Sequence, residues 1–182
     1  MIQLKHLPLD DISISSPYGA RSITVNGRYY WWHNGLDLKA QLNTPVYAVA
    51  DGEVMAARYD NSYGYYIAID HGKFGTLYAH LSHYKVTEGS IVKSGEIIGH
   101  TGNTGDTTGP HLHFEIRLGS YANFWERAHC DRSVFMNTID PMLFIEDFFN
   151  KKDNLSVEEA AKIVQSAAGL EDKTMDYIVK HY

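Results

Sequence analysis

The sequence predicts a mostly β protein: an antiparallel β-sandwich or partial barrel, followed by a C-terminal helical hairpin. Between about Ile12 and Ile116, short apolar or alternating runs are separated by turns rich in glycine, asparagine and aspartate. No convincing 3.6-residue apolar period occurs in this region, so helices are not expected there. Many short strands with regular turn signals are typical of sandwiches and barrels.

Most of the expected strands end at a recognisable turn. The run that ends at Val25 meets Asn26-Gly27, which is the strongest two-residue hairpin signal. Asp51-Gly52, His71-Gly72 and Lys93-Ser94-Gly95 divide the later runs in the same way. Strands are therefore expected over residues 12–14, 22–25, 45–50, 53–57, 65–70, 75–81, 90–92, 96–99 and 111–116.

The pattern changes after Leu118. Residues 119–138 contain aromatic side chains without periodicity, and we expect a long loop that is either functional or covers an open end of the sheet. Asp140-Pro141 then starts a short apolar segment that closes the β domain. This gives a predicted domain over residues 1-149.

A helical appendage is predicted over residues 150-182. Ser156 and Glu159 form a capping box at the start of one helix, which Gly169 ends. A second helix is expected from Glu171 to Tyr182. The hairpin is too small to hold a core alone, so it must pack on the β domain, on a copy of itself or on a partner protein.

Composition excludes several classes of protein. A net charge of −6 without a basic tract gives no electrostatic case for nucleic acid. No apolar run is long enough to span a membrane. The single cysteine excludes a disulfide framework and a multi-cysteine zinc site, so any metal site must use histidine, aspartate or glutamate. The first ten residues show no signal peptide, so the chain either is not exported by that route or has lost its leader.

Two histidines lie two residues apart in the strand expected after Pro110. Alternation places His111, His113 and Glu115 on one face, opposite an apolar face that we assign to the core. The histidines are then about 6.6 Å apart, at roughly 3.3 Å per residue. Such a pair can serve one metal site, but on its own it is more often a solvent-facing pattern.

His33 and Asp37 form a second candidate pair. On a straight strand they would stand about 13 Å apart, too far to share one ion through bonds of about 2 Å. If both are ligands, the chain must bend between them, and Gly35 is the residue that permits the bend. We therefore expect His33 in a loop and Asp37 at the start of a strand.

A third candidate, His80, lies in an expected strand on the face away from the core. Together the candidates form a zinc hydrolase site. His33, Asp37 and His113 supply three ligands and leave one position for water. His80 and His111 remain for acid/base work and for stabilising the oxyanion.

Glu115 is the alternative base. It lies farther along the strand, and pairing with Arg117 or another surface charge is the favoured interpretation of this residue.

These motifs resemble the M23 family of zinc metallopeptidases, the lysostaphin-like peptidoglycan endopeptidases. The family's H-x-x-x-D motif matches His33 and Asp37, its H-x-H motif matches His111 and His113, and its intervening histidine matches His80. The resemblance covers about Ser13 to Leu118, plus Asp140-Pro141. Other matching segments are Tyr18-Gly19-Ala20-Arg21, Thr44-Pro45-Val46-Tyr47-Ala48, Asp51-Gly52-Glu53-Val54 and Gly89 through Gly99.

The resemblance implies a lysostaphin-like fold and one Zn2+ ion per chain, bound by His33, Asp37 and His113. It implies His80 and His111 as catalytic residues. The substrate would be the peptide part of bacterial peptidoglycan, either a D-alanyl–diaminopimelate cross-link or a pentaglycine bridge.

Four residues near His33 are candidates for substrate binding. A tyrosine in this loop often assists the oxyanion in the family, and Tyr29 or Tyr30 could do so here. Trp32 and Asn34 flank the histidine and complete the set.

Two alternatives remain open beside an active endopeptidase. One is an inactive relative that binds the wall or an amidase partner, although such proteins usually lose metal ligands. The other is a carrier domain on a similar flattened barrel, for which the setting of Lys93 is unusual. The missing leader favours a virion-associated or tail-associated enzyme, or a phage lysin released at lysis, acting on the bacterial cell wall.

Overall fold

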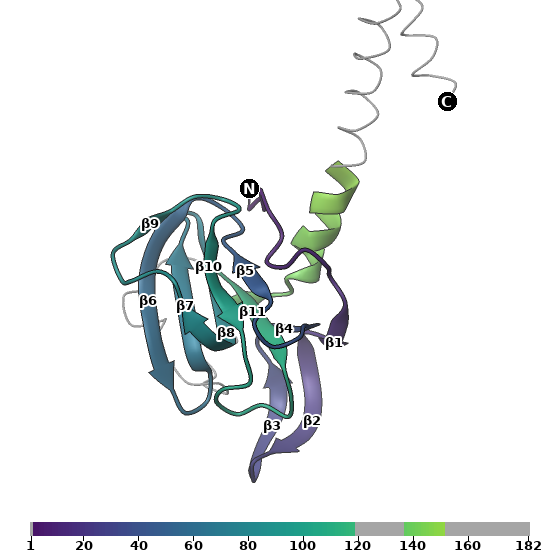
Figure 1. Cartoon of the computed structure of the whole chain (residues 1–182). Helices are drawn as coiled ribbons and strands as arrows, with labels where there is room; N and C mark the ends of the chain where they lie inside the picture. Colours follow the sequence, from purple (N-terminus) through teal and green to yellow (C-terminus); the bar gives the residue numbers. More distant parts are fainter. Residues whose placement is uncertain (1, 119–136, 152–182) are drawn as a thin grey trace, which may run out of the picture. The chain divides into compact units, whose positions relative to one another are not determined.

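The computed structural model describes residues 2–118 and 137–151 (Figure 1). This part of the chain forms twelve strands: β1 (Ile14–Ser16), β2 (Gly19–Val25), β3 (Arg28–His33), β4 (Leu36–Lys39), β5 (Pro45–Tyr47), β6 (Gly52–Asp60), β7 (Gly64–Asp70), β8 (Phe74–Tyr84), β9 (Ile91–Val92), β10 (Ile97–Thr101), β11 (His111–Leu118) and β12 (Thr138–Ile139).

Ten strands form one sheet. Seven of them are hydrogen-bonded side by side in the order β1-β4-β11-β8-β7-β6-β9. β10 pairs with β5 and β8, and β12 pairs with β11, while β2 and β3 form a separate two-stranded sheet. Every pairing is antiparallel. The predicted mostly β, antiparallel fold is therefore confirmed.

The β2–β3 hairpin turns where the sequence predicts. Asn26 has a φ of 50° and Gly27 a φ of 80°, and two positive φ values are what a type I′ turn requires. Elsewhere the bounds differ from expectation. The strand expected over 45–50 ends at Tyr47, and β3 extends through His33, which was expected in a loop.

β8 changes its neighbour halfway along its length. Its first half pairs with β11 as far as the pair Ala79–His113, and its second half pairs with β10 from Leu81 onward. On its other side, the register with β7 shifts between the pairs Ile67–Tyr78 and Tyr65–Leu81. His80, at the point of change, has a φ of 60°. Strand alternation alone therefore does not determine where the His80 side chain points.

The core extends to both faces of β11. Leu112, Phe114 and Ile116 are fully buried, as expected. The other face was expected to lie away from the core, yet Glu115 and Arg117 are also fully buried. The expectation that this face lies away from the core was wrong at Glu115 and Arg117, because polar partners inside the domain, described below, satisfy these charges.

A helix over residues 142–151 follows β12. Asp140 Oδ1 accepts a hydrogen bond from the Met142 N–H at 2.9 Å, as an N-cap residue does, and Pro141 suits the first helical position. The sequence predicted only an apolar segment here. No helix in the described part of the chain is long and apolar enough to cross a membrane.

The chain divides into two compact units, residues Met1–Phe144 and Ile145–Tyr182. The first contains all twelve strands. The predicted helical hairpin, from Ser156 to Tyr182, and the loop over 119–136 lie outside the described residues. The division into domains 1-149 and 150-182 stays a prediction.

We expect a chain that ends after Lys151 to fold. Among the described residues, the twelve strands and the buried apolar side chains form a core that ends before Lys151, so this core should keep its cooperative unfolding transition. Thermal denaturation followed by circular dichroism checks this against the full chain. Loss of the cooperative transition would show that residues 152–182 belong to the β domain.

Candidate metal centre

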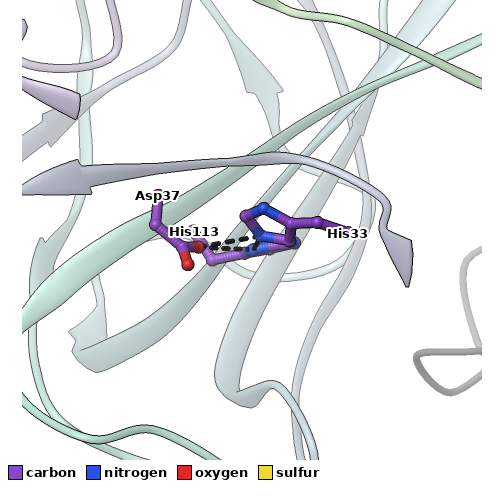
Figure 2. A group of neighbouring side chains, drawn as sticks. All are labelled: His33, Asp37 and His113. Carbon is purple, nitrogen blue, oxygen red and sulfur yellow. Dashed lines mark hydrogen bonds and ion pairs between the residues drawn. The ribbon is translucent and has the colours of Figure 1, made fainter. Parts of the chain in front are cut away.

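Three side chains, from β3, β4 and β11, bring their ligand atoms together (Figure 2). His33 Nε2 lies 3.1 Å from Asp37 Oδ1 and 3.0 Å from His113 Nδ1, and His113 Nδ1 lies 2.9 Å from Asp37 Oδ1. Possible ligand atoms of all three residues lie within 4.8 Å of one another. The structure thus joins the His33/Asp37 pair and His113 in one cluster, as the sequence predicts.

Strand pairing and one bend assemble this cluster. Asp37 in β4 pairs directly with His113 in β11. His33 ends β3, and the chain bends through Asn34 and Gly35 before β4 begins. The predicted bend is confirmed, and it allows two residues four apart in the sequence to meet.

Gly35 is needed for a reason other than the one the sequence suggested. Its φ lies outside the left-handed region, so the bend itself does not require glycine. A Cβ atom at this position would lie 2.5 Å from the Phe114 carbonyl oxygen and 2.9 Å from His113 Cε1. The close approach of β11 therefore excludes any side chain at Gly35.

Hydrogen bonds outside the cluster fix the tautomers of both histidines. His33 Nδ1–H donates to the Pro17 carbonyl oxygen at 2.7 Å, and His113 Nε2–H donates to Glu115 Oε1 at 2.9 Å. In the neutral forms, His33 Nε2 and His113 Nδ1 then carry lone pairs toward each other and toward Asp37 Oδ1. Three acceptors about 3 Å apart repel one another unless a cation lies among them.

The donor set fits a zinc ion. Two imidazole nitrogens and one carboxylate oxygen are ordinary zinc ligands, and around a tetrahedral ion with bonds of 2.0–2.2 Å they stand roughly 3.3–3.6 Å apart. The distances here are close to that range. Both histidines also have the outer hydrogen-bond partner that metal-ligating histidines almost always show.

The pKa values reflect the same crowding of acceptors. Burial alone would raise the pKa of Asp37, but the neighbouring imidazoles of His111, His113 and His33, which favour the carboxylate when they are protonated, hold it well below its usual range. Burial alone would lower the pKa of His113, yet hydrogen bonds to Asp37 and Glu115 raise it above its usual value. The Asp37 carboxylate thus stays charged, and its charge favours the protonated form of His113.

His80 and His111 lie beside the cluster with their rings 4.7 Å apart. His80 Nδ1–H donates to the Thr104 carbonyl oxygen at 2.8 Å, and His111 Nδ1–H donates to the Gly109 carbonyl oxygen at 2.8 Å. His111 Nε2 is 3.5 Å from Asp37 Oδ1. Burial, together with the charges of His111 and His113, lowers the pKa of His80 to about 3, so this ring is neutral near pH 7.

A cleft opens over Asp37, His80, His111 and His113. Sequence reasoning gave no role to most of its other lining residues. Arg21 is the most informative of these, since its Nη1 lies 3.8 Å from Asp37 Oδ2. The sequence segment Tyr18-Gly19-Ala20-Arg21, which matches the family, could have indicated that Arg21 belongs to the site. The remaining lining residues are Ile23, Val25, Tyr30, Asp106, Thr107 and Thr108.

Of the four residues proposed for substrate binding, only Tyr30 is among the lining residues of this cleft. Its hydroxyl donates to Asp106 Oδ2 at 2.6 Å, which holds the β2–β3 hairpin to the loop before β11. Tyr29 is 58% exposed and donates to Ser22. Trp32 packs edge-on against Tyr18, and Asn34 is buried. Their role in substrate binding stays a prediction.

A family model described as "Peptidase family M23" matches residues 32–124. Among curated relatives, the peptidoglycan DD-endopeptidase ShyA of Vibrio cholerae is 46% identical over 104 residues, which cover 57% of this chain and 24% of ShyA. The chain spans about a quarter of the length of the curated relatives it matches.

Solved structures are also similar. The catalytic domain of lysostaphin from Staphylococcus simulans aligns with a TM-score of 0.64 and 31% identity, over 78% of this chain and 99% of that domain. A zinc-containing peptidase from Vibrio cholerae aligns with a TM-score of 0.61 and 31% identity, over 76% of this chain and 39% of that one. The expected lysostaphin-like fold is confirmed.

We expect Gly35→Ala to weaken zinc binding by about tenfold or more, a size typical of changes around metal ligands. The added methyl group would push β11, and with it His113, away from Asp37. Gly109→Ala is a matched control, because it lies near the site but its Cβ would meet no atom within 4 Å. The measurement is the zinc Kd by chelator competition, and equal affinities in both variants would contradict the close-approach argument.

Proposed function

Because this chain belongs to peptidase family M23, we propose that it is a zinc-dependent endopeptidase that hydrolyses peptide cross-links or stem peptides of bacterial peptidoglycan. One observation carries the proposal. The ligand atoms of His33, Asp37 and His113 form a triangle with sides of about 3 Å, and two further histidines border the same cleft. An inactive wall-binding relative would have no need to keep all five residues.

In this proposal His33, Asp37 and His113 hold one Zn2+ ion per chain. When bound, zinc supplies Lewis acidity, which lowers the pKa of water and polarises a carbonyl oxygen. The fixed tautomers of the two histidines present the nitrogens that this role needs.

His80 and His111 carry the proton transfers. Each ring donates its Nδ1–H to a backbone carbonyl, so in the neutral form each Nε2 holds a lone pair. Either Nε2 can accept a proton from the attacking water and, once charged, donate a hydrogen bond to the oxyanion or a proton to the leaving amine. The low pKa of His80 keeps the ring neutral near pH 7, so its Nε2 can accept a hydrogen bond from the attacking water.

The bond that we propose first is the D-alanyl–diaminopimelate cross-link. ShyA, at 46% identity, is named a peptidoglycan DD-endopeptidase. Arg21 adds a positive charge to the cleft wall beside Asp37. That charge suits a substrate with a free carboxylate next to the scissile amide, which a pentaglycine bridge does not have.

We further propose that the chain acts at the bacterial cell wall as a phage lysin or as a tail-associated, virion-borne enzyme. Immunodetection of the chain in purified virions and in lysates tests this part separately. Binding of a partner protein or of a second copy through the C-terminal helices also stays a prediction.

Removing zinc should abolish cleavage. Defined muropeptides with a D-alanyl–diaminopimelate cross-link or a pentaglycine bridge are incubated with chelator-treated protein, and the products are identified by mass spectrometry. We expect cleavage of the first substrate only after zinc is restored. Full cleavage by metal-free protein would contradict the zinc mechanism, and cleavage of the glycine bridge alone would reverse the proposed specificity.

Alanine substitutions should separate the ligands from the catalytic histidines. His113→Ala should lose zinc and activity together. His111→Ala and His80→Ala should keep zinc and lower kcat by about 10²–10⁴-fold each. The double variant should lose less than the product of the single effects, because both groups act on one transition state.

Zinc per chain and kcat on a defined cross-linked peptide are measured for each variant. His83→Ala is a matched control, since this histidine lies on β8 but is not among the residues that line the cleft. Zinc loss from His111→Ala with retention in His113→Ala would show that the two roles are exchanged.

A further inference from the structure

We propose that Glu115, held by Arg117 and Tyr63, is a positioning residue that sets the His113 tautomer and strengthens His113 as a zinc ligand. The inference rests on the proposed function, because it concerns affinity for the same ion. It goes further by giving a role to three buried polar residues outside the cluster of ligands.

The three residues form a closed network with His113. Glu115 and Arg117 are 0% exposed, and Tyr63 and His113 are 1% exposed. Glu115 Oε1 accepts hydrogen bonds from His113 Nε2–H and from the Tyr63 hydroxyl, each at 2.9 Å. Glu115 Oε2 accepts from Arg117 Nε at 2.7 Å, and Arg117 Nη2 donates to the Tyr63 hydroxyl oxygen at 3.1 Å.

The network allows only one tautomer of neutral His113. An ionised carboxylate only accepts hydrogen bonds, so the proton between His113 and Glu115 belongs to Nε2. His113 Nδ1 then keeps its lone pair and faces Asp37 Oδ1 and His33 Nε2. A carboxylate behind an imidazole also raises the basicity of the nitrogen that binds the metal.

Arg117 and Tyr63 make the buried carboxylate possible. An isolated carboxylate in a dry interior is strongly unfavourable, and it would take up a proton and lose its effect on His113. Arg117 keeps it charged through an ion pair, and Tyr63 supplies a third donor. His113, Glu115 and Arg117 are spaced two residues apart along β11, so their side chains share one face of the strand. That face therefore holds the proposed zinc ligand, the carboxylate bound to it and the positive charge that balances the carboxylate.

A purely structural ion pair is the competing explanation. Such a pair contributes to stability, and its replacement by neutral groups should leave zinc affinity unchanged once the fold is intact. A positioning residue should instead change zinc affinity even in a variant of parental stability. The two explanations therefore differ in an equilibrium that does not require turnover.

The experiment uses the full chain and zinc alone. Glu115→Gln removes the negative charge but leaves Arg117 buried without its partner, so the double variant Glu115→Gln/Arg117→Met is made as well. Glu88→Gln is the matched control, because Glu88 forms an exposed ion pair with Arg58. Zinc Kd is measured by chelator competition, and Tm is measured on the metal-free proteins.

We expect both Glu115 variants to bind zinc about 10–100-fold more weakly than the parent, the usual effect of losing an outer-shell partner. The double variant should regain Tm relative to Glu115→Gln without regaining zinc affinity. The control should match the parent. In zinc-loaded parent protein, long-range ¹⁵N–¹H NMR should show His113 protonated at Nε2.

Two results would overturn the inference. One is a folded double variant whose zinc Kd lies within about twofold of the parental value, and the other is His113 protonated at Nδ1. Either result leaves the proposed function standing if the parent binds zinc and cleaves its substrate. A parent that binds no zinc would overturn the proposed function and this inference together.

Discussion

The pairing of β4 with β11 is the constraint on which the site depends. Asp37 lies directly opposite His113, and one residue of slip would turn every side chain of a strand to the other face. Gly35 makes this register possible, because only a hydrogen atom fits between it and Phe114. The cluster of His33, Asp37 and His113 is thus a property of strand packing, and all five polar side chains of the site lie on paired strands.

A second constraint acts on His80 through the backbone. β8 separates from β11 and joins β10 at this residue, and a left-handed φ in a non-glycine residue costs about 1–3 kcal/mol. The Tyr63 carbonyl accepts from the His80 N–H, and the Thr104 carbonyl accepts from the ring. The loop that carries Thr104 packs closely on Tyr63 through Gly105. Contacts on both sides therefore fix a conformation that the strand alone would avoid.

Motif spacing and turn chemistry predicted much of this arrangement from the sequence. His33, Asp37 and His113 meet, and the hairpin at Asn26-Gly27 turns as expected. The alternating strand pattern predicted the wrong burial for Glu115 and Arg117. The pattern treats charged residues as exposed, and it cannot detect that these two form an ion pair with each other inside the domain. The helix over 142–151 was missed because apolar residues in a short run do not distinguish a helix from a strand.

In the proposed zinc site, the polar interior would couple metal binding to stability. Both histidines have their outer nitrogens bound, so without a cation the inner lone pairs and the Asp37 carboxylate oppose one another at about 3 Å. Burial alone would lower the pKa of His113, but the carboxylates of Asp37 and Glu115 raise it. An ion that binds only the folded chain stabilises it in proportion to the logarithm of its concentration over Kd. If zinc binds as proposed, the arrangement would therefore also make the stability of the folded chain depend on that ion.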